Sequence, residues 1–173
     1  MKFQLVDRIT GLESGESARG VKNLSAAEEY LGDHFPGFPV MPGVLMLEAL
    51  TQLSAWIVRE ATDFEPTVVL LKEAKAVKYN SFLVPGKTLE LESMLGKRDG
   101  REWTFKTAGR IRDDEGGEPA NGCSAKLTLT AFTLGEQNPA QAEADERLRA
   151  AFREQFATLW QPAGSAGLAA PAS

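Results

Sequence analysis

The stretch DHFPGFPVMPGVLMLEALTQLSAWIVRE, residues 33–60, decides the fold. It opens as a loop rich in proline and glycine and continues as a long run that contains neither residue after Gly43. Proline fits the start of a helix, because its missing N–H would have no partner in the first turn. We therefore predict a helix that begins at Pro42 or Gly43 and ends near Ala61.

This predicted helix has almost no polar face before Arg59. A helix that is apolar all round is buried in a core or in a membrane. Glu48 interrupts the apolar run, which leaves it shorter than the roughly 20 residues that a membrane span needs. A buried central helix is the better interpretation. Its apolar residues are Val44, Leu45, Met46, Leu47, Leu50, Leu53, Trp56, Ile57 and Val58.

Glu48 is the unusual residue of this helix. A carboxylate among apolar side chains costs several kcal/mol unless it is paired or protonated. One interpretation places Glu48 on a polar edge or on a backbone group. The other is an acid kept neutral by burial and ready to donate a proton. The one histidine of the chain, His34, lies in the rigid loop just upstream, so the two residues form a plausible acid/base pair.

The start of the helix supplies a third chemical element. The first N–H groups of a helix have no intrahelical partner, and the helix dipole is positive there. Gly43 has no side chain to keep another group from its N–H. The N–H of Gly43 or Val44 could therefore hold a carbonyl oxygen as it gains negative charge. Base, acid and oxyanion donor fall within one short segment.

These residues resemble a known signature. His34-Phe35-Pro36-Gly37, Pro39, Met41-Pro42-Gly43-Val44, Glu48 and Gln52 look like the motif of the 3-hydroxyacyl-acyl-carrier-protein dehydratases of fatty-acid synthesis. Weaker similarity extends from residue 5 to about residue 132. The glutamate resembles the general dehydratase branch, since the related dehydratase-isomerase branch carries an aspartate there. The resemblance implies the hot-dog fold.

The resemblance also implies roles for individual residues. His34 would remove the C2 proton, Glu48 would protonate the departing C3 hydroxyl, and the N–H of Gly43, with Val44, would polarise the thioester carbonyl. Gln52, one turn beyond Glu48, would orient its carboxyl group, and Phe35 would support the loop through a cis peptide bond after His34. No metal and no other cofactor is implied. The expected assembly is a homo-oligomer, a dimer or a trimer of dimers, in which His34 of one subunit faces Glu48 of the other.

Length and composition fit one soluble domain. The 173 residues are 43% hydrophobic and 25% charged, with a net charge of −5 that argues against nucleic acid as a partner. Cys123 has no second cysteine with which to pair and is expected to be a buried bystander in a reducing cytoplasm. The sequence shows no signal pattern or membrane segment. We expect a cytoplasmic protein.

The rest of the chain predicts an α+β architecture, in which an antiparallel sheet of about six strands wraps around the central helix. A turn at residues 13–16 joins the first two strands, and a capping box at Ser25 to Glu28 predicts a short helix that ends near Leu31. In the strand that begins at Thr67, the apolar residues Val68 to Leu71 are expected to be buried. The predicted strands are residues 7–12, 17–24, 67–79, 88–95, 102–112 and 125–134.

The C-terminal part adds a second helix, because Asn138-Pro139 is typical of an N-cap followed by proline. The residues that line one face at helical spacing are Leu148, Phe152, Gln155, Leu159 and Trp160. We favour packing on its own domain over a lid or an oligomer contact. The predicted organisation is a hot-dog domain at residues 1–136, the amphipathic helix at 137–160 and a disordered tail at 161–173.

Two departures from the family pattern affect the expected substrate. Phe38 stands where the family commonly has arginine, and residues 80–82 replace a basic pair and a proline. Chain length and carrier contacts therefore stay open. An acidic acyl carrier protein would need a local basic patch. The candidates, which also fit scattered solvated charges, are Lys72, Lys75, Lys78, Lys97, Arg98 and Arg101.

Two rival functions use the same fold. A hot-dog thioesterase would use an acid on the helix to activate water, and it would not need His34 in this loop. A non-catalytic acyl-binding or assembly module would tolerate the loss of His34 or Glu48, whereas a dehydratase would not.

Overall fold

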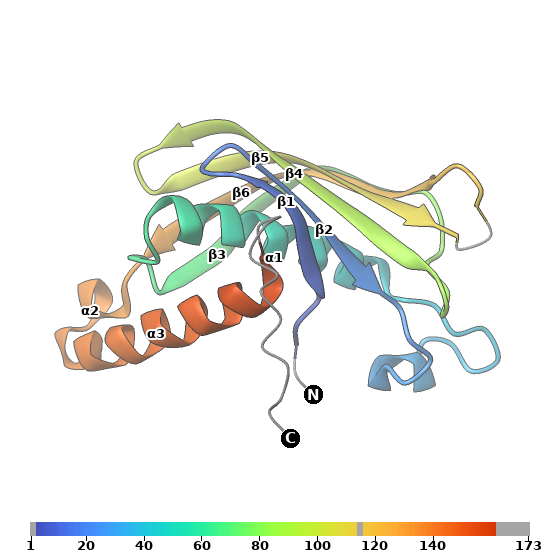
Figure 1. Ribbon diagram of the computed structural model, residues 1–173, viewed down its shortest axis with the longest axis horizontal. Coiled ribbons are helices and arrows are strands. Elements are labelled where there is room, and N and C mark those ends of the chain that lie inside the picture. The colour runs from blue at the N-terminus through green and yellow to red at the C-terminus, as the bar shows by residue number, and fades with distance from the viewer. Residues whose placement is uncertain (1–2, 114–115, 162–173) are drawn as a thin grey trace, which may run out of the picture.

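The computed structural model describes residues 3–113 and 116–161. Six strands form one antiparallel sheet in the order β1-β2-β4-β5-β6-β3. The sheet curves over α1 (Gly43–Ala61), and α3 (Ala142–Leu159) lies on the side of α1 that faces away from the sheet (Figure 1). The predicted architecture and the predicted bounds of the central helix are confirmed.

The strands agree with the sequence pattern in place, and they pair antiparallel as predicted. Two of them run further than predicted, since β4 continues beyond Leu95 into a tight hairpin at Gly100, and β6 begins before residue 125. Gly122 weakens the strand signal of β6, because glycine offers a strand no side chain to pack. The strands are β1 (Arg8–Glu13), β2 (Ser17–Asn23), β3 (Val68–Tyr79), β4 (Thr88–Asp99), β5 (Glu102–Arg112) and β6 (Ala120–Phe132).

Helix α1 forms the centre of the core. Leu50, Leu53 and Ile57 are 0% exposed, and burying each such side chain contributes about 1.5–3 kcal/mol. A polar contact at this depth is satisfied, because the hydroxyls of Ser54 and Ser93 lie 2.7 Å apart across the α1–β4 contact. No helix among the described residues is both long and apolar enough to cross a membrane.

The predicted burial of the first residues of β3 is wrong. Val68 and Val69 are half-buried, while Leu70 and Leu71 are 52% and 38% exposed. The reason is the position of β3 at the edge of the sheet, where it pairs with β6 alone. A run of four apolar residues is typical of a buried strand. The run itself does not indicate that the strand order places it at the edge of the sheet.

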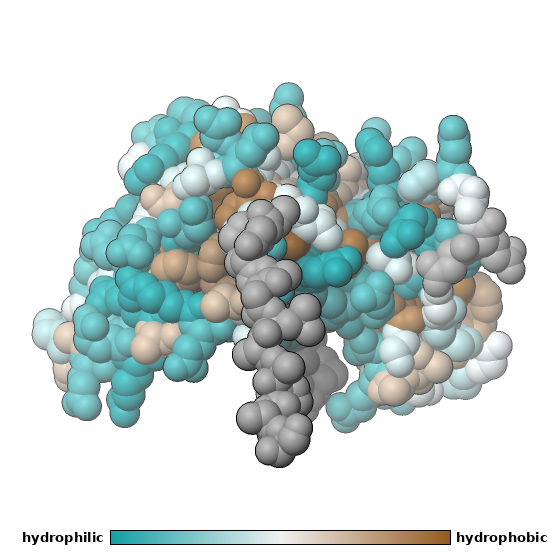
Figure 2. Space-filling model, in the orientation of Figure 1, coloured by the Kyte–Doolittle hydropathy of each residue, from teal (hydrophilic) through white to brown (hydrophobic). Residues whose placement is uncertain are grey.

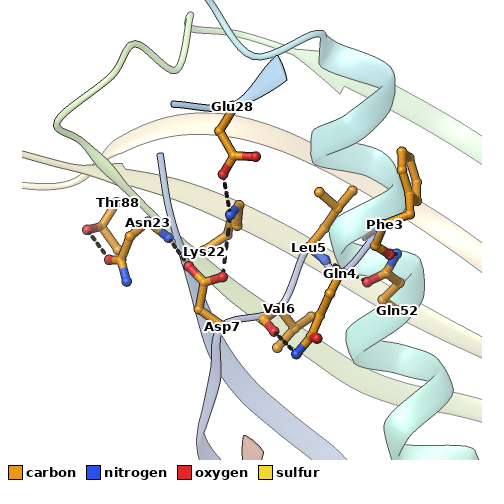
Figure 3. Close-up of polar contacts among 10 residues, drawn as sticks. All are labelled: Phe3, Gln4, Leu5, Val6, Asp7, Lys22, Asn23, Glu28, Gln52 and Thr88. Carbon is orange, nitrogen blue, oxygen red and sulfur yellow. Dashed lines mark hydrogen bonds and ion pairs between the residues drawn. The ribbon is translucent and has the colours of Figure 1, made fainter. Parts of the chain in front are cut away.

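The short helix predicted from Ser25 is also wrong. The chain forms only a 3-10 turn, η1 (Glu29–Gly32). The Glu28 carboxylate, which the capping box would use, instead accepts a hydrogen bond of 2.6 Å from the buried Lys22 ammonium, which also faces Asp7 at 3.4 Å (Figure 3). A buried ammonium needs these carboxylates more than a helix start needs its cap.

The C-terminal segment begins with two short turns, α2 (Leu134–Gln137) and η2 (Pro139–Gln141), before α3. Asn138 does cap, accepting a hydrogen bond from the Ala140 N–H at 3.1 Å, but the cap serves η2. In α3, the rings of Phe152 and Phe156 pack on Trp56 of α1, with centroids 6.2 and 5.9 Å away. Packing of this helix on its own domain is thereby confirmed. The predicted tail at 161–173 lies almost wholly outside the described residues.

Candidate active site

The loop before α1 is fixed by a network of backbone hydrogen bonds. The N–H of His34 donates to Tyr30 O at 3.2 Å, and the N–H of Val40 donates to His34 O at 3.0 Å. Phe35 and Phe38 bond each other in both directions, at 3.1 and 2.9 Å. The His34–Phe35 peptide bond is cis, as the resemblance implied, and the two rings stack with centroids 4.0 Å apart.

The imidazole of His34 is held by its own loop. Nδ1 lies 3.0 Å from the carbonyl oxygen of Val40. A carbonyl can only accept, so we assign the proton to Nδ1. This tautomer leaves Nε2 with a free lone pair, as a general base requires.

His34 faces a pocket of about 420 Å³ at the start of α1. The N–H groups of Leu45 and Met46 bond Pro42 O, whereas those of Gly43 and Val44 precede the first helical hydrogen bond. The pocket is largely apolar, and only a few backbone and side-chain polar groups interrupt its wall. Its lining residues are His34, Phe35, Met41, Pro42, Gly43, Val44, Met46, Tyr79, Asn80, Ser81 and Phe82.

Position 43 requires glycine, because the ring of Tyr79 packs against the start of α1. A Cβ added at Gly43 would lie 2.9 Å from a Tyr79 ring carbon, closer than real contacts allow. Burial, with a contribution from neighbouring Cys123, raises the pKa of Tyr79, so the phenol stays neutral. Sequence analysis missed Tyr79, because a tyrosine that ends a strand looks like ordinary sheet.

Glu48 lies one turn further along α1 and is held by Gln52. The Gln52 amide donates to Glu48 Oε1 at 3.0 Å and to Phe3 O at 3.2 Å, and its oxygen accepts from the Leu5 N–H at 2.9 Å. Figure 3 shows Gln52 reaching from α1 to the N-terminal segment. The predicted contact between Gln52 and Glu48 is present. The expected burial of Glu48 is wrong for a single chain, where this residue is half-buried and nearby Val44 is 64% exposed.

The structure does not place His34 and Glu48 in the same pocket. Glu48 lines a separate pocket of about 250 Å³ on the outer side of α1, together with Gln52, Val69 and residues of α3. Strand β3 touches both pockets, with Val69 near its start in the Glu48 pocket and Tyr79 at its end in the His34 pocket. One chain therefore holds the two predicted catalytic residues in separate pockets.

The predicted basic patch is largely neutralised. Lys75 pairs with Glu73 at 2.9 Å and Lys97 with Asp99 at 3.0 Å, while Lys78 has no ion pair among the described residues. Lys72 pairs with Glu102, Arg101 pairs with Glu136, and Arg98 stacks over Trp103.

Known proteins are similar to the part of the chain that contains His34 and Glu48. The model of the FabA-like domain family matches residues 1–115. The curated 3-hydroxyacyl-(acyl-carrier-protein) dehydratase FabZ of Granulibacter bethesdensis is 38% identical over 111 residues, which are 63% of this chain and 65% of the relative. The protein of the same name from Moorella thermoacetica is 42% identical over 99 residues, 57% of this chain and 69% of the relative.

A solved structure shows the same fold at low sequence identity. A chain of the dehydratase heterocomplex ApeI:P from Xenorhabdus doucetiae has a TM-score of 0.58 and 16% identity, over 81% of this chain and 90% of that chain. Together with the family match, this likeness confirms the hot-dog architecture. All of α3 lies beyond residue 115, where the match to the FabA-like family ends.

Proposed function

Because the chain belongs to the FabA-like family, we propose that it removes water from a 3-hydroxyacyl thioester, carried by an acyl carrier protein, and yields the trans-2-enoyl thioester. The observation that supports this most directly is the fixed imidazole of His34, with Nδ1 on Val40 O, in an apolar pocket that ends at the free N–H groups of α1. A base and an oxyanion donor beside one apolar pocket suit removal of a proton next to a carbonyl.

The reaction assigns one step to each group. The thioester oxygen accepts from the Gly43 N–H, with Val44 beside it, which makes the C2 proton more acidic. His34 Nε2 takes that proton. The electron pair of the C2–H bond then forms the C2=C3 double bond as the C3–O bond breaks. Glu48 gives its proton to the leaving hydroxyl, which departs as water. The proton on His34 then returns to Glu48 through solvent.

The His34 pocket and the Glu48 pocket would meet when two subunits pair. We propose that β3 of one subunit joins β3 of a second in antiparallel fashion, since this edge is unpaired and carries the exposed Leu70 and Leu71. Antiparallel pairing brings the Val69 end of one strand beside the Tyr79 end of the other. The Glu48 pocket of one subunit then adjoins the His34 pocket of its partner.

The carrier would dock near the mouth of the His34 pocket. Among the predicted basic residues, Lys78 and Arg98 have no carboxylate partner in the described part of the chain. Of these two, Lys78 directly precedes Tyr79, which lines that pocket. Acyl carrier proteins are acidic, so a cation at the mouth guides the carrier and its arm toward His34.

Product analysis tests the activity. The purified protein is incubated with one 3-hydroxyacyl thioester on the carrier protein and, separately, on coenzyme A. We expect the enoyl thioester, with the His34→Ala variant inactive although it folds. Release of free acid would identify a thioesterase instead. Binding without turnover, unaffected by His34→Ala, would identify an acyl-binding module.

A further inference from the structure

Arg59 is a half-buried cation that the proposed reaction does not use. Its side chain makes no hydrogen bond or ion pair with any described residue, and its Nε is fully shielded without a partner. Burial lowers the pKa of Arg59 to about 10, which leaves it protonated at neutral pH. Buried guanidinium groups are normally paired, because an unpaired one is costly.

Arg59 contacts two aromatic rings but no hydrogen-bond acceptor among the described residues. The guanidinium lies 4.3 Å from the ring centroid of Phe152 and 5.3 Å from that of Trp56. Such stacking satisfies the charge in part, but the N–H donors point outward in the guanidinium plane, and the shielded Nε has no acceptor among the described residues. That fork matches a carboxylate, which it binds through two parallel hydrogen bonds.

The cavity that Arg59 lines is the one that holds Glu48. Both residues border the same pocket of about 250 Å³, with Gln52, Ala55 and Trp56 between them on α1. Eleven residues of helix place their Cα atoms about 16 Å apart along the axis. Glu48, the acid that would act at C3, therefore lies at one end of the pocket. Arg59 lies at the other end, on the same face of α1.

The outer wall of this pocket comes from the C-terminal helix. Phe152 and Gln155 of α3 line it, opposite the α1 residues. Both lie beyond residue 115, where the match to the FabA-like family ends. In Figure 2, apolar side chains gather over the space between the sheet and α3. The extension thus shapes the environment of Arg59.

We propose that Arg59 binds a carboxylate at the far end of the acyl chain, so that the substrates include 3-hydroxyacyl thioesters whose distal end is a carboxylate rather than a methyl group. The proposal rests on the proposed dehydratase function. The chain would pass along α1 from C3 at Glu48, past Gln52 and Ala55, and end at the guanidinium. Gln155 stands near enough to the pocket to offer the same group a further hydrogen bond.

The test compares matched substrates on one carrier. Methyl-ended and carboxylate-ended 3-hydroxyacyl thioesters of several equal lengths are supplied to the wild-type protein, and kcat/KM is measured for each. We expect the carboxylate-ended substrate to be preferred at the lengths that reach Arg59. In Arg59→Met, the ratio of the two kcat/KM values should fall roughly 10- to 100-fold, as expected for a lost hydrogen-bonded charge.

Arg153→Met is the matched control. Arg153 also lies over an aromatic ring, that of Phe64 at 5.3 Å, but it is exposed and pairs with Asp63. Its substitution should leave the substrate ratio unchanged. A wild-type protein that dehydrates methyl-ended substrates at least as well at every length would overturn the proposal while the dehydratase function stands, whether or not Arg59→Met folds. Failure to dehydrate either kind would instead reject the dehydratase function.

Discussion

Gln52 ties Glu48 to the beginning of the chain. Its amide nitrogen donates to Glu48 Oε1 at 3.0 Å and to Phe3 O at 3.2 Å, so the carboxylate on α1 is positioned by the segment that leads into β1. The orientation of the proposed acid therefore depends on a contact between residues that are far apart in sequence.

Gln52→Ala should lower kcat more than it raises KM, because Glu48 keeps its chemistry but loses its orientation. We expect a loss of roughly 10- to 100-fold in kcat, the scale of a hydrogen bond to a charged group. The melting temperature should also fall, since Phe3 and Leu5 lose their anchor. Gln4→Ala is the control, because among the described residues the Gln4 side chain bonds only Val6 O, at 3.3 Å. Equal losses of kcat in both variants would contradict a positioning role.

Glu48→Gln separates catalysis from stability. The variant keeps the size of the side chain and can still bond Gln52, but it cannot donate an acidic proton. We expect normal folding, little change in substrate binding, and dehydration slower by roughly 10²–10⁴-fold, the usual contribution of general acid–base catalysis. Turnover and melting temperature are measured on one preparation. A less stable protein with near-normal turnover per folded molecule would assign Glu48 a structural role.

Mixed subunits test the composite site. His34→Ala and Glu48→Ala proteins are each expected to be inactive. In a random mixture of exchanging dimers, half are mixed and each mixed dimer has one intact site, so activity should return to about a quarter of the wild-type value. Subunit exchange is verified separately by mass or fluorescence. If mixed dimers form and no activity returns, the two residues do not act across the interface.

Gly43→Ala tests the start of α1 in two ways. The new methyl group would press on the Tyr79 ring, and such overpacking typically costs about 1–3 kcal/mol. It would also screen the N–H that we assign to the thioester oxygen. Adding Tyr79→Val should restore the melting temperature of Gly43→Ala without restoring kcat/KM. If both the melting temperature and kcat/KM recover, glycine at position 43 is required only for packing against Tyr79.

Asp145 should make stability depend on pH. Burial alone would raise its pKa, but hydrogen bonds from Thr67 and from the backbone N–H groups of Gly135 and Leu134, with Arg149 nearby, lower it below the usual 3.8. A lowered folded-state pKa gives stability that is present above the unfolded value and lost as the pH falls through the folded one. Asp145→Asn should therefore melt lower than wild type at pH 7, and the gap should shrink below about pH 4. A gap independent of pH would rule out this linkage.

Local sequence signals predicted the parts of the fold that local physics decides. The helix from Gly43 to Ala61 follows from a proline-glycine start and an uninterrupted apolar run. The hairpin turns follow from their glycine and acidic residues, and the strand 102–112 follows from alternation. The contact between Gln52 and Glu48 follows from their spacing of one helical turn. In each case the partners lie close together in sequence.

The features that sequence reasoning missed depend on distant partners. Lys22 draws Glu28 away from its expected capping role, and the strand order exposes Leu70, which its neighbours suggest is buried. From the sequence, Arg59 is interpreted as the polar end of the central helix. In the structure, α3 packs beside it. None of these outcomes is encoded in a short window, because each requires knowing which segment packs on which.

The uncovered edge of β3 also bears on solubility. A long edge strand with apolar side chains is a template on which other chains can add and aggregate. Here the apolar pair at residues 70–71 is followed by Lys72, Lys75 and Lys78, and lysines of this kind act as gatekeepers against open-ended stacking. The strand is thus suited to accept one matched partner and to discourage the growth of fibrils, and its lysines should matter most when the protein is newly made and still unpaired.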